Sequence, residues 1–243
     1  MADVAVVGLG EVGRPLLEVV KRAGHDVVGI DVAPIELPER GSLDVLHICF
    51  PFEIDDFVGE SQRYIQLLEP RLTVINSTVS VGTTRSIHER TKSPLVHSPV
   101  RGKHVRMTDE LLRYTKFIGP IDAAAGSAAE EHFGSLGMST KTLASPEATE
   151  LAKLSETTYF AVMIAWAQEV ERLCDRIGVD YDEVVSIYEE IDFFPSVKYF
   201  PGVIGGHCVL PNIEILEHVD DSPILKAIRW SNAAKIEREA ADS

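Results

Sequence analysis

Residues 3–31, DVAVVGLGEVGRPLLEVVKRAGHDVVGID, decide the fold of the first half of this chain. A β-branched run at Val4–Val7 is followed by Gly8, Gly10 and Gly13 in the spacing G-x-G-x-x-G, then by an amphipathic helical pattern and a second apolar run. In this motif the first glycine makes a tight turn, the second lets a pyrophosphate approach the backbone, and the third lets the helix pack on the strand. The stretch therefore predicts a strand, helix and strand that bind a dinucleotide.

The acid at the end of the second apolar run indicates which dinucleotide. Asp31 lies 18 positions beyond Gly13, where a carboxylate accepts hydrogen bonds from an adenosine ribose and repels a 2′-phosphate. We therefore expect NAD rather than NADP. The order of strand, glycines, helix, strand and acid favours this interpretation over a glycine-rich turn without a ligand. The expected NAD-binding residues of this stretch are Gly8, Leu9, Gly10, Glu11, Val12, Gly13 and Asp31.

The rest of the first half continues the same rhythm. Apolar runs near 44–49, 72–76, 94–97, 116–118 and 139–142 alternate with helical patterns near 54–68, 83–90 and 122–135. This alternation predicts a Rossmann-type, doubly wound parallel sheet. In such sheets ligands bind beyond the carboxyl ends of the strands, so we expect Pro51, Ser77 and Thr78 to lie beside the nicotinamide.

The second half is predicted to be helical. Beyond Pro146 the chain carries no glycine or proline until Gly178, and its apolar residues recur at helical spacing, which predicts one long connecting helix near 146–177. Further helical patterns cover 181–190 and 222–240. We expect an NAD-binding domain at 1–145 and an all-helical domain at 146–243 for substrate binding and dimerisation. The long helix is the expected interface of a homodimer.

Composition excludes several classes of partner. The 243 residues carry 23 Lys and Arg against 38 Asp and Glu, a net charge of −15, which disfavours nucleic acid and anionic membranes as partners. Three cysteines at unrelated spacings predict neither a disulfide framework nor a metal site. No apolar run approaches the roughly 18 residues of a membrane span. We expect a cytoplasmic protein with a small-molecule substrate.

Four segments together resemble the nucleotide-sugar 6-dehydrogenases, which include the UDP-glucose, GDP-mannose and UDP-N-acetylmannosamine enzymes. These segments are GLGEVG (8–13), NSTVSVGTT (76–84), ELAKLSETTYFAVMIAWAQEV (150–170) and PGVIGGHCVLPN (201–212). They occur in the order of that family and span nearly the whole chain. The resemblance implies oxidation of a primary alcohol to an acid by two hydride transfers to NAD, through a thiohemiacetal and a thioester on a loop cysteine.

The resemblance also assigns roles to residues of this chain. The nucleophile would be Cys208, Lys153 would stabilise oxyanions or handle protons, and Thr78 would supply a hydroxyl. His207 would either assist the thiol or form hydrogen bonds within its loop, and both interpretations stay open. The expected substrate-binding residues are Arg101, His104, Thr157, Gly206, His207 and Asn212.

Three positions depart from the family pattern. Val100 stands where the family has a carboxylate, Thr157 where it has an asparagine and Asn212 where it has an aspartate. Because valine and a neutral amide cannot act as general bases near pH 7, oxidation could end at the aldehyde or at the acid. The family also carries a third, C-terminal domain that binds the nucleotide sugar. The resemblance therefore predicts a shortened member, with a smaller substrate or one presented by a separate protein.

Three functions follow from these patterns. The first is an NAD-dependent dehydrogenase acting on a primary alcohol or aldehyde of a sugar-like or other small polar substrate, with Cys208 as covalent nucleophile. The second is a β-hydroxyacid-type dehydrogenase that uses Lys153 alone. The third is an NAD-binding module that has lost catalysis. Alanine variants of the two residues would separate the first two functions.

Overall fold

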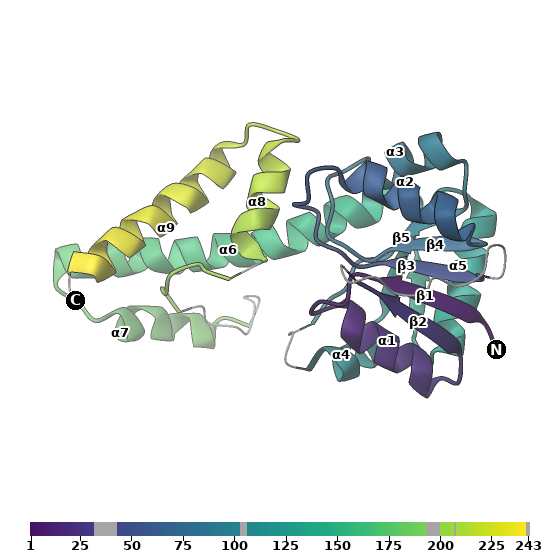
Figure 1. Ribbon diagram of the computed structural model, residues 1–243. Helices are drawn as coiled ribbons and strands as arrows, with labels where there is room; N and C mark the ends of the chain where they lie inside the picture. Colours follow the sequence, from purple (N-terminus) through teal and green to yellow (C-terminus); the bar gives the residue numbers. More distant parts are fainter. Residues whose placement is uncertain (32–42, 103–105, 193–199, 207, 242–243) are drawn as a thin grey trace. The chain divides into compact units, whose positions relative to one another are not determined.

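The computed structural model describes residues 1–31, 43–102, 106–192, 200–206 and 208–241. Contacts between residues divide the chain into two compact units, Met1–Lys153 and Leu154–Ser243. The division falls inside the long helix α6 (Pro146–Ile177), labelled in Figure 1. His104 and His207, two of the predicted substrate-binding residues, lie outside the described part of the chain.

The first unit is built on one seven-stranded sheet with the order β2-β1-β3-β4-β5-β6-β7. Neighbours from β2 to β5 run parallel, with Val4 of β1 paired to Val27 on one side and Val45 on the other. This confirms the predicted Rossmann-type fold. One detail differs, because β6 runs antiparallel to β5. The strands are β1 (Asp3–Val7), β2 (Asp26–Ile30), β3 (Val45–Ile48), β4 (Leu72–Ile75), β5 (Leu95–His97), β6 (Lys116–Pro120) and β7 (Thr140–Thr142).

Helices cover both faces of the sheet (Figure 1). One apolar cluster joins the sheet to α1 (Gly13–Arg22), α4 (Met107–Arg113) and α5 (Ala123–Ser135). The other joins it to α2 (Phe57–Leu68) and α3 (Thr83–Thr91). Because β3 and β4 lie between these layers, all their residues are buried, as is typical of strands in a doubly covered parallel sheet.

In the described part of the second unit, all regular structure is helical. In one apolar cluster, Ala161 of α6 packs with Ile213 and Ile228. A second apolar cluster contains Val170 and Cys174, also on α6. The helices that follow α6 are α7 (Tyr181–Ser186), the short 3₁₀ helix η2 (Ile187–Glu190), α8 (Val209–Glu217) and α9 (Pro223–Ala241). The long helix predicted near 146–177 is confirmed, and Gly178, whose φ is +80°, follows its last residue.

Two helices of the structure were not predicted. Helix α4 is short, and α8 begins directly after Cys208, in a stretch that the glycines and Pro211 had marked as a loop. Proline is tolerated in the first turn of a helix, where its missing N–H has no intrahelical acceptor. The predicted nucleophile therefore stands at the start of a helix and not in the middle of a loop.

Candidate functional site

The glycine turn lies where the strand order reverses. Chain connections leave β1 toward β2 on one side and return to β3 on the other, and ligands bind in the crevice at such a switch point. Gly8 has a φ of +89°, and a Cβ there would come within 2.5 Å of the Phe50 backbone nitrogen. A Cβ on Gly13 would lie 1.9 Å from the Gly8 carbonyl oxygen. These two positions admit only glycine.

The middle of the turn faces open space. A Cβ on Gly10 would have no other atom within 4 Å, and Gly10 and Glu11 are exposed, whereas Leu9 and Val12 are half-buried. The turn ends at the first residue of α1, so its backbone N–H groups lead into a helix N-terminus. A helix N-terminus with an open approach is suited to an anionic group such as a pyrophosphate.

Other predicted residues come to the same edge of the sheet. The Gly8 N–H donates to the Ile30 carbonyl oxygen at 2.8 Å, which brings the turn beside the half-buried Asp31 at the end of β2. Pro51 is exposed in the loop after β3. The Ser77 hydroxyl donates to the Phe50 carbonyl oxygen at 2.6 Å, so the loops after β3 and β4 are joined. Thr78, the next residue, is half-buried.

A buried histidine attaches the start of α6 to this edge. His97 Nε2 lies 3.1 Å from the Ser77 carbonyl oxygen and Nδ1 lies 2.8 Å from Thr149 Oγ1. Burial lowers the pKa of His97 to about 3, so the ring is neutral at pH 7. Since a carbonyl can only accept, Nε2 carries the proton and Nδ1 accepts from the Thr149 hydroxyl.

The next residue of α6 caps α3. The carboxylate of Glu150 accepts the backbone N–H groups of Gly82 at 2.7 Å and Thr84 at 2.9 Å, at the start of α3. Lys153 follows three residues later and is half-buried. The predicted lysine is thus on a helical turn that is fixed to the first unit by Thr149 and Glu150.

Arg101 is held by its own unit. Its Nη2 donates to the Thr115 carbonyl oxygen at 2.7 Å, and its guanidinium carbon lies 4.7 Å from the centre of the Phe117 ring. The neighbouring Val100 is buried in the apolar core. The position at which the family has a carboxylate therefore belongs to the packing of this chain.

In the second unit three of the predicted residues, Gly206, Cys208 and Asn212, lie in or just before the first turn of α8. Cys208 is the N-cap residue and is exposed, and Gly206 before it has a φ of +82°. Asn212 is buried, and its backbone N–H donates to the Cys208 carbonyl oxygen at 3.2 Å. Thr157 is buried on α6. Thr78 and Lys153 belong to the first unit, whereas Cys208, Thr157 and Asn212 belong to the second.

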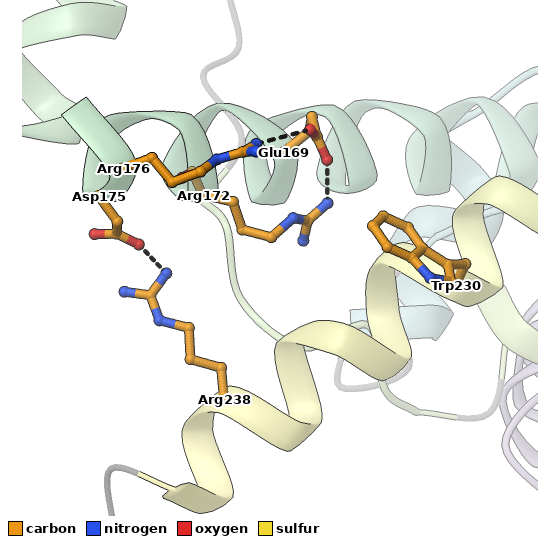
Figure 2. A pocket seen from close by; sticks show the side chains of 6 residues that line it. All are labelled: Glu169, Arg172, Asp175, Arg176, Trp230 and Arg238. Atoms are coloured by element: carbon orange, nitrogen blue, oxygen red, sulfur yellow. Dashed lines mark hydrogen bonds and ion pairs between the residues drawn. The ribbon is translucent and has the colours of Figure 1, made fainter.

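A separate cavity of about 680 Å³ lies between α6 and α9 (Figure 2). Its charged groups pair with one another: Arg172 Nη2 donates to Glu169 at 2.5 Å, and Arg238 pairs with Asp175. None of the predicted residues lines it. The lining residues are Glu169, Arg172, Asp175, Arg176, Trp230 and Arg238.

Sequence reasoning missed a buried polar network in the first unit. Lys116, Asn76, His47 and His132 are each at most 6% exposed and are joined by hydrogen bonds. The only signal was a polar residue within an apolar run, as at His47 in DVLHICF. Within the described ranges, no three His, Cys, Asp or Glu side chains are grouped to hold a metal ion. No helix in the part of the chain that the structure describes could span a membrane.

Comparison with protein families matches residues 147–238 to the UDP-glucose/GDP-mannose dehydrogenase family, central domain. Through this region, which is less than half of the chain, the sequence is similar to that family. The match begins on α6 and includes Cys208 and all of α8. The expected family resemblance is therefore confirmed for the helical region, and it was visible in the sequence as the segments at 150–170 and 201–212.

Individual relatives extend the likeness to the first unit. A UDP-N-acetyl-D-mannosamine dehydrogenase of Methanococcus maripaludis is 26% identical, with 94% of this chain covered. The chain spans 64% of that relative's length. The UDP-D-ManNAc dehydrogenase structure from Pyrococcus horikoshii has a TM-score of 0.84 at 24% identity. The structural match covers 98% of this chain and 70% of the Pyrococcus chain.

A second type of dehydrogenase shares the fold. The structure of a 3-hydroxyisobutyrate dehydrogenase from Mycobacterium tuberculosis has a TM-score of 0.73 at 17% identity. The likeness covers 99% of this chain and 94% of that one. Both types of neighbour therefore contain a sheet unit followed by a helical unit of this kind.

Proposed function

We propose that this protein is an NAD-dependent oxidoreductase that acts on a primary alcohol or aldehyde of a sugar-like or other small polar substrate. One observation carries the proposal: an open glycine turn at the switch point of the sheet is followed by a family-matched helical region whose Cys208 is exposed. The first feature would hold a dinucleotide and the second would supply a nucleophile.

The residues at the turn fit a dinucleotide. Side chains are excluded at Gly8 and Gly13 by backbone atoms, while the space in front of Gly10 is open. Asp31, next to this turn, would accept hydrogen bonds from the ribose. Pro51, Ser77 and Thr78 would border the nicotinamide end. When bound, the nicotinamide would accept a hydride from the substrate carbon.

The remaining chemistry belongs to side chains of this chain. Lys153 would exchange a proton with the substrate oxygen, and the Thr78 hydroxyl would donate a hydrogen bond to that oxygen. The thiolate of Cys208 would add to an aldehyde carbon, so that a C–S bond forms and the carbonyl π pair moves to oxygen, where a proton from Lys153 neutralises it. An exposed sulfur at the start of α8 is accessible for this addition.

The substrate class follows from the named relatives. Several are dehydrogenases of UDP-N-acetyl-D-mannosamine, so we infer a sugar-like substrate contacted by Arg101, Thr157, Gly206 and Asn212, together with His104 and His207. This chain spans 64% of the length of one such relative and 59% of another. A second form of the proposal is a substrate presented by a separate protein.

The test is an assay of NADH formation by purified protein with NAD and a panel of sugars, nucleotide sugars and hydroxy acids. We expect turnover with a sugar-like alcohol or aldehyde. The turnover rate should fall by at least about 10³-fold in Cys208→Ala, as is usual when a catalytic nucleophile is removed. Binding of NAD, measured by calorimetry, should be unchanged in that variant. Absence of both NAD binding and turnover would refute the proposal, while binding without turnover would indicate a module that has lost catalysis.

One observation favours the β-hydroxyacid alternative. The structural match to a 3-hydroxyisobutyrate dehydrogenase extends over nearly the whole of both chains. A single hydride transfer needs Lys153 and no thiol. In that case Cys208→Ala would keep activity with hydroxy acids, whereas Lys153→Ala would lose it. Equal loss in both variants would exclude this alternative.

We also propose a homodimer through α6. In the single chain Tyr159, Phe160 and Trp166 on this helix are 55%, 41% and 57% exposed, and covering large apolar side chains is favourable. Light scattering should give twice the chain mass. A monomer mass across micromolar concentrations would contradict the proposed dimer.

A further inference from the structure

Lys116 is a buried cation at the edge of the sheet that carries the predicted cofactor site. It is the first residue of β6, which pairs antiparallel with β5 through Val96 with Pro120 and His97 with Gly119. Because β6 runs in the opposite direction, its first residue lies at the edge where the parallel strands end. Its exposed fraction is 4%.

The ammonium of Lys116 joins two loops. Nζ donates to the carbonyl oxygens of Ser98 at 2.7 Å and Pro99 at 3.2 Å, in the loop after β5. It also donates to Asn76 Oδ1 at 3.4 Å, in the loop after β4. An ammonium group has three N–H donors and no acceptor. The three oxygens therefore match the protonated form of the side chain.

The hydrogen bonds continue from Asn76 into the core in one direction. Asn76 Nδ2 lies 3.1 Å from His47 Nδ1, which accepts because the amide nitrogen can only donate. His47 Nε2 then carries the proton and donates to His132 Nε2 at 2.8 Å. Lys116 is thus the start of a network that fixes the orientation of the Asn76 amide.

Both loops held by Lys116 carry predicted site residues. Ser77 and Thr78 directly follow Asn76, and Arg101 lies two residues after Pro99. Arg101 itself is held by the carbonyl oxygen of Thr115, the residue before Lys116. Movement of the first residues of β6 would therefore displace the side chains expected around the nicotinamide and the substrate.

Among the residues that the structure describes, no carboxylate pairs with this buried ammonium. Its hydrogen-bond partners among the described residues are neutral oxygens, and Phe133 faces Nζ with its ring centre at 5.3 Å. Burial raises the pKa of the nearby Cys49 to about 12, so its thiol is neutral at pH 7. An apolar residue would fill the same space without the desolvation cost of a charge. The charge therefore has a use other than packing.

We propose that Lys116 is a positioning residue whose buried ammonium fixes the loops after β4 and β5 relative to each other and so shapes the nicotinamide end of the cofactor site. The cofactor part of this inference rests on the proposed function. The loop-fixing part stands on the contacts of the first unit alone.

The contact is sensitive to pH. Burial lowers the pKa of Lys116 to about 7, and the charges of Arg101 and Lys153 lower it as well, whereas Cys49 would raise it only as a thiolate. The other titratable groups around it, His47 and His97, have pKa values lowered by burial and stay neutral above pH 7. Loss of the proton removes one of three donors, so the loops should loosen as the pH rises through about 7.

The experiment compares Lys116→Met with His132→Leu, a matched control that disrupts the far end of the network without touching either loop. NAD affinity by calorimetry, thermal stability and amide hydrogen exchange would be measured between about pH 6 and 8.5. Lys116→Met should weaken NAD binding by about 10-fold or more, remove the decline in affinity with rising pH, and speed exchange at residues 76–82 and 98–102. His132→Leu should lower stability but keep the NAD affinity and its pH dependence.

The outcomes separate the two proposals. Unchanged NAD affinity and unchanged loop exchange in Lys116→Met, or equal weakening of NAD in both variants, would overturn the role of Lys116. If the wild-type protein binds no NAD, the proposed function fails, and loop exchange alone decides whether Lys116 fixes the loops. If Lys116→Met does not fold, wild-type exchange at pH 6 and 8.5, corrected for intrinsic rates, replaces it: faster exchange confined to the two loops at the higher pH supports the proposal, and unchanged exchange overturns it.

Discussion

The two units place their chemistry-bearing side chains in opposite environments. In the first unit, Lys116, His47 and His97 are buried and joined through hydrogen bonds to the loops that surround the glycine turn. In the second, Cys208 is exposed at the start of α8, and ion pairs such as Arg238 with Asp175 lie at the surface. The first unit is therefore built to hold backbone positions fixed, and the second exposes a cysteine.

The cysteines show the difference most directly. Cys49 follows β3 and lies next to Gly13, since a Cβ built on Gly13 would be 3.4 Å from the Cys49 Cβ. Burial raises the pKa of the Cys49 thiol to about 12. Cys208 has no such burial. The same residue type is thus half-buried with a raised pKa in one unit and exposed in the other, which the sequence alone does not reveal.

Alkylation should give the largest difference. At pH 7 a thiol with a pKa of about 12 is about 10⁻⁵ thiolate, and the thiolate is the form that reacts with iodoacetamide. We therefore expect iodoacetamide to modify Cys208 at least about 10³-fold faster than Cys49. Peptide mass spectrometry over time gives both rates in the same sample, and Cys208→Ser is the control. Comparable rates at the two positions would show that the units do not differ in this way.

The sequence predicted the first unit well because its signals are local. The glycine spacing and Asp31 lie within 31 residues, and strand periodicity marks the remaining elements. The network around Lys116 could not be predicted, because His47, Asn76 and His132 come from distant segments that meet only through strand order. A short strand also looks the same in either direction, so the reversal of β6 was not visible.

The second unit was predicted by other means. Helical periodicity gave α6 with its bounds, but the start of α8 was hidden by the glycines before Cys208 and by Pro211. The family resemblance identified Cys208 as a candidate, and the structure adds that it is the N-cap residue of a helix. Local pattern thus accounts for the fold, whereas the candidate site depended on comparison with a family.

Acid should destabilise the first unit by several kcal/mol. Burial lowers the pKa of His97 to about 3 and that of His132 to about 4, whereas the unfolded chain takes up protons near pH 6.5. The unfolded state therefore binds more protons as the pH falls from 6.5 to 4, and the free energy of unfolding drops by up to about 1.4 kcal/mol per group per pH unit.

The two units can be followed separately in this experiment. Both tryptophans of the chain, Trp166 and Trp230, lie in the second unit, so their fluorescence reports that unit during urea unfolding. Amide exchange in β3 and β5 reports the first. We expect exchange in β3 and β5 to accelerate between pH 6.5 and 4.5, and His97→Gln to reduce this dependence. Equal pH dependence of both signals would contradict the separation.

The smallest effects compare one carboxylate from each unit. Glu150 is fully buried and accepts the N–H groups of Gly82 and Thr84. In Glu150→Gln the amide group would face an N–H donor, so we expect a loss of about 1–3 kcal/mol. Asp175 pairs with Arg238, but their side chains are 48% and 38% exposed. Asp175→Asn should cost less than about 1 kcal/mol, because exposed ion pairs are screened by water and salt.

Amide exchange in α3 for Glu150→Gln, and tryptophan-detected urea unfolding for Asp175→Asn, measure these two changes. The order matters more than either value. A larger loss in Asp175→Asn would mean that the surface ion pairs of the second unit stabilise it as strongly as buried contacts stabilise the first. NAD binding can be compared in the same two variants. If Glu150→Gln weakens NAD binding and Asp175→Asn does not, the hydrogen bonds of Glu150 fix the position of the α6 turn that carries Lys153, since Glu150 connects that turn to the loop after β4.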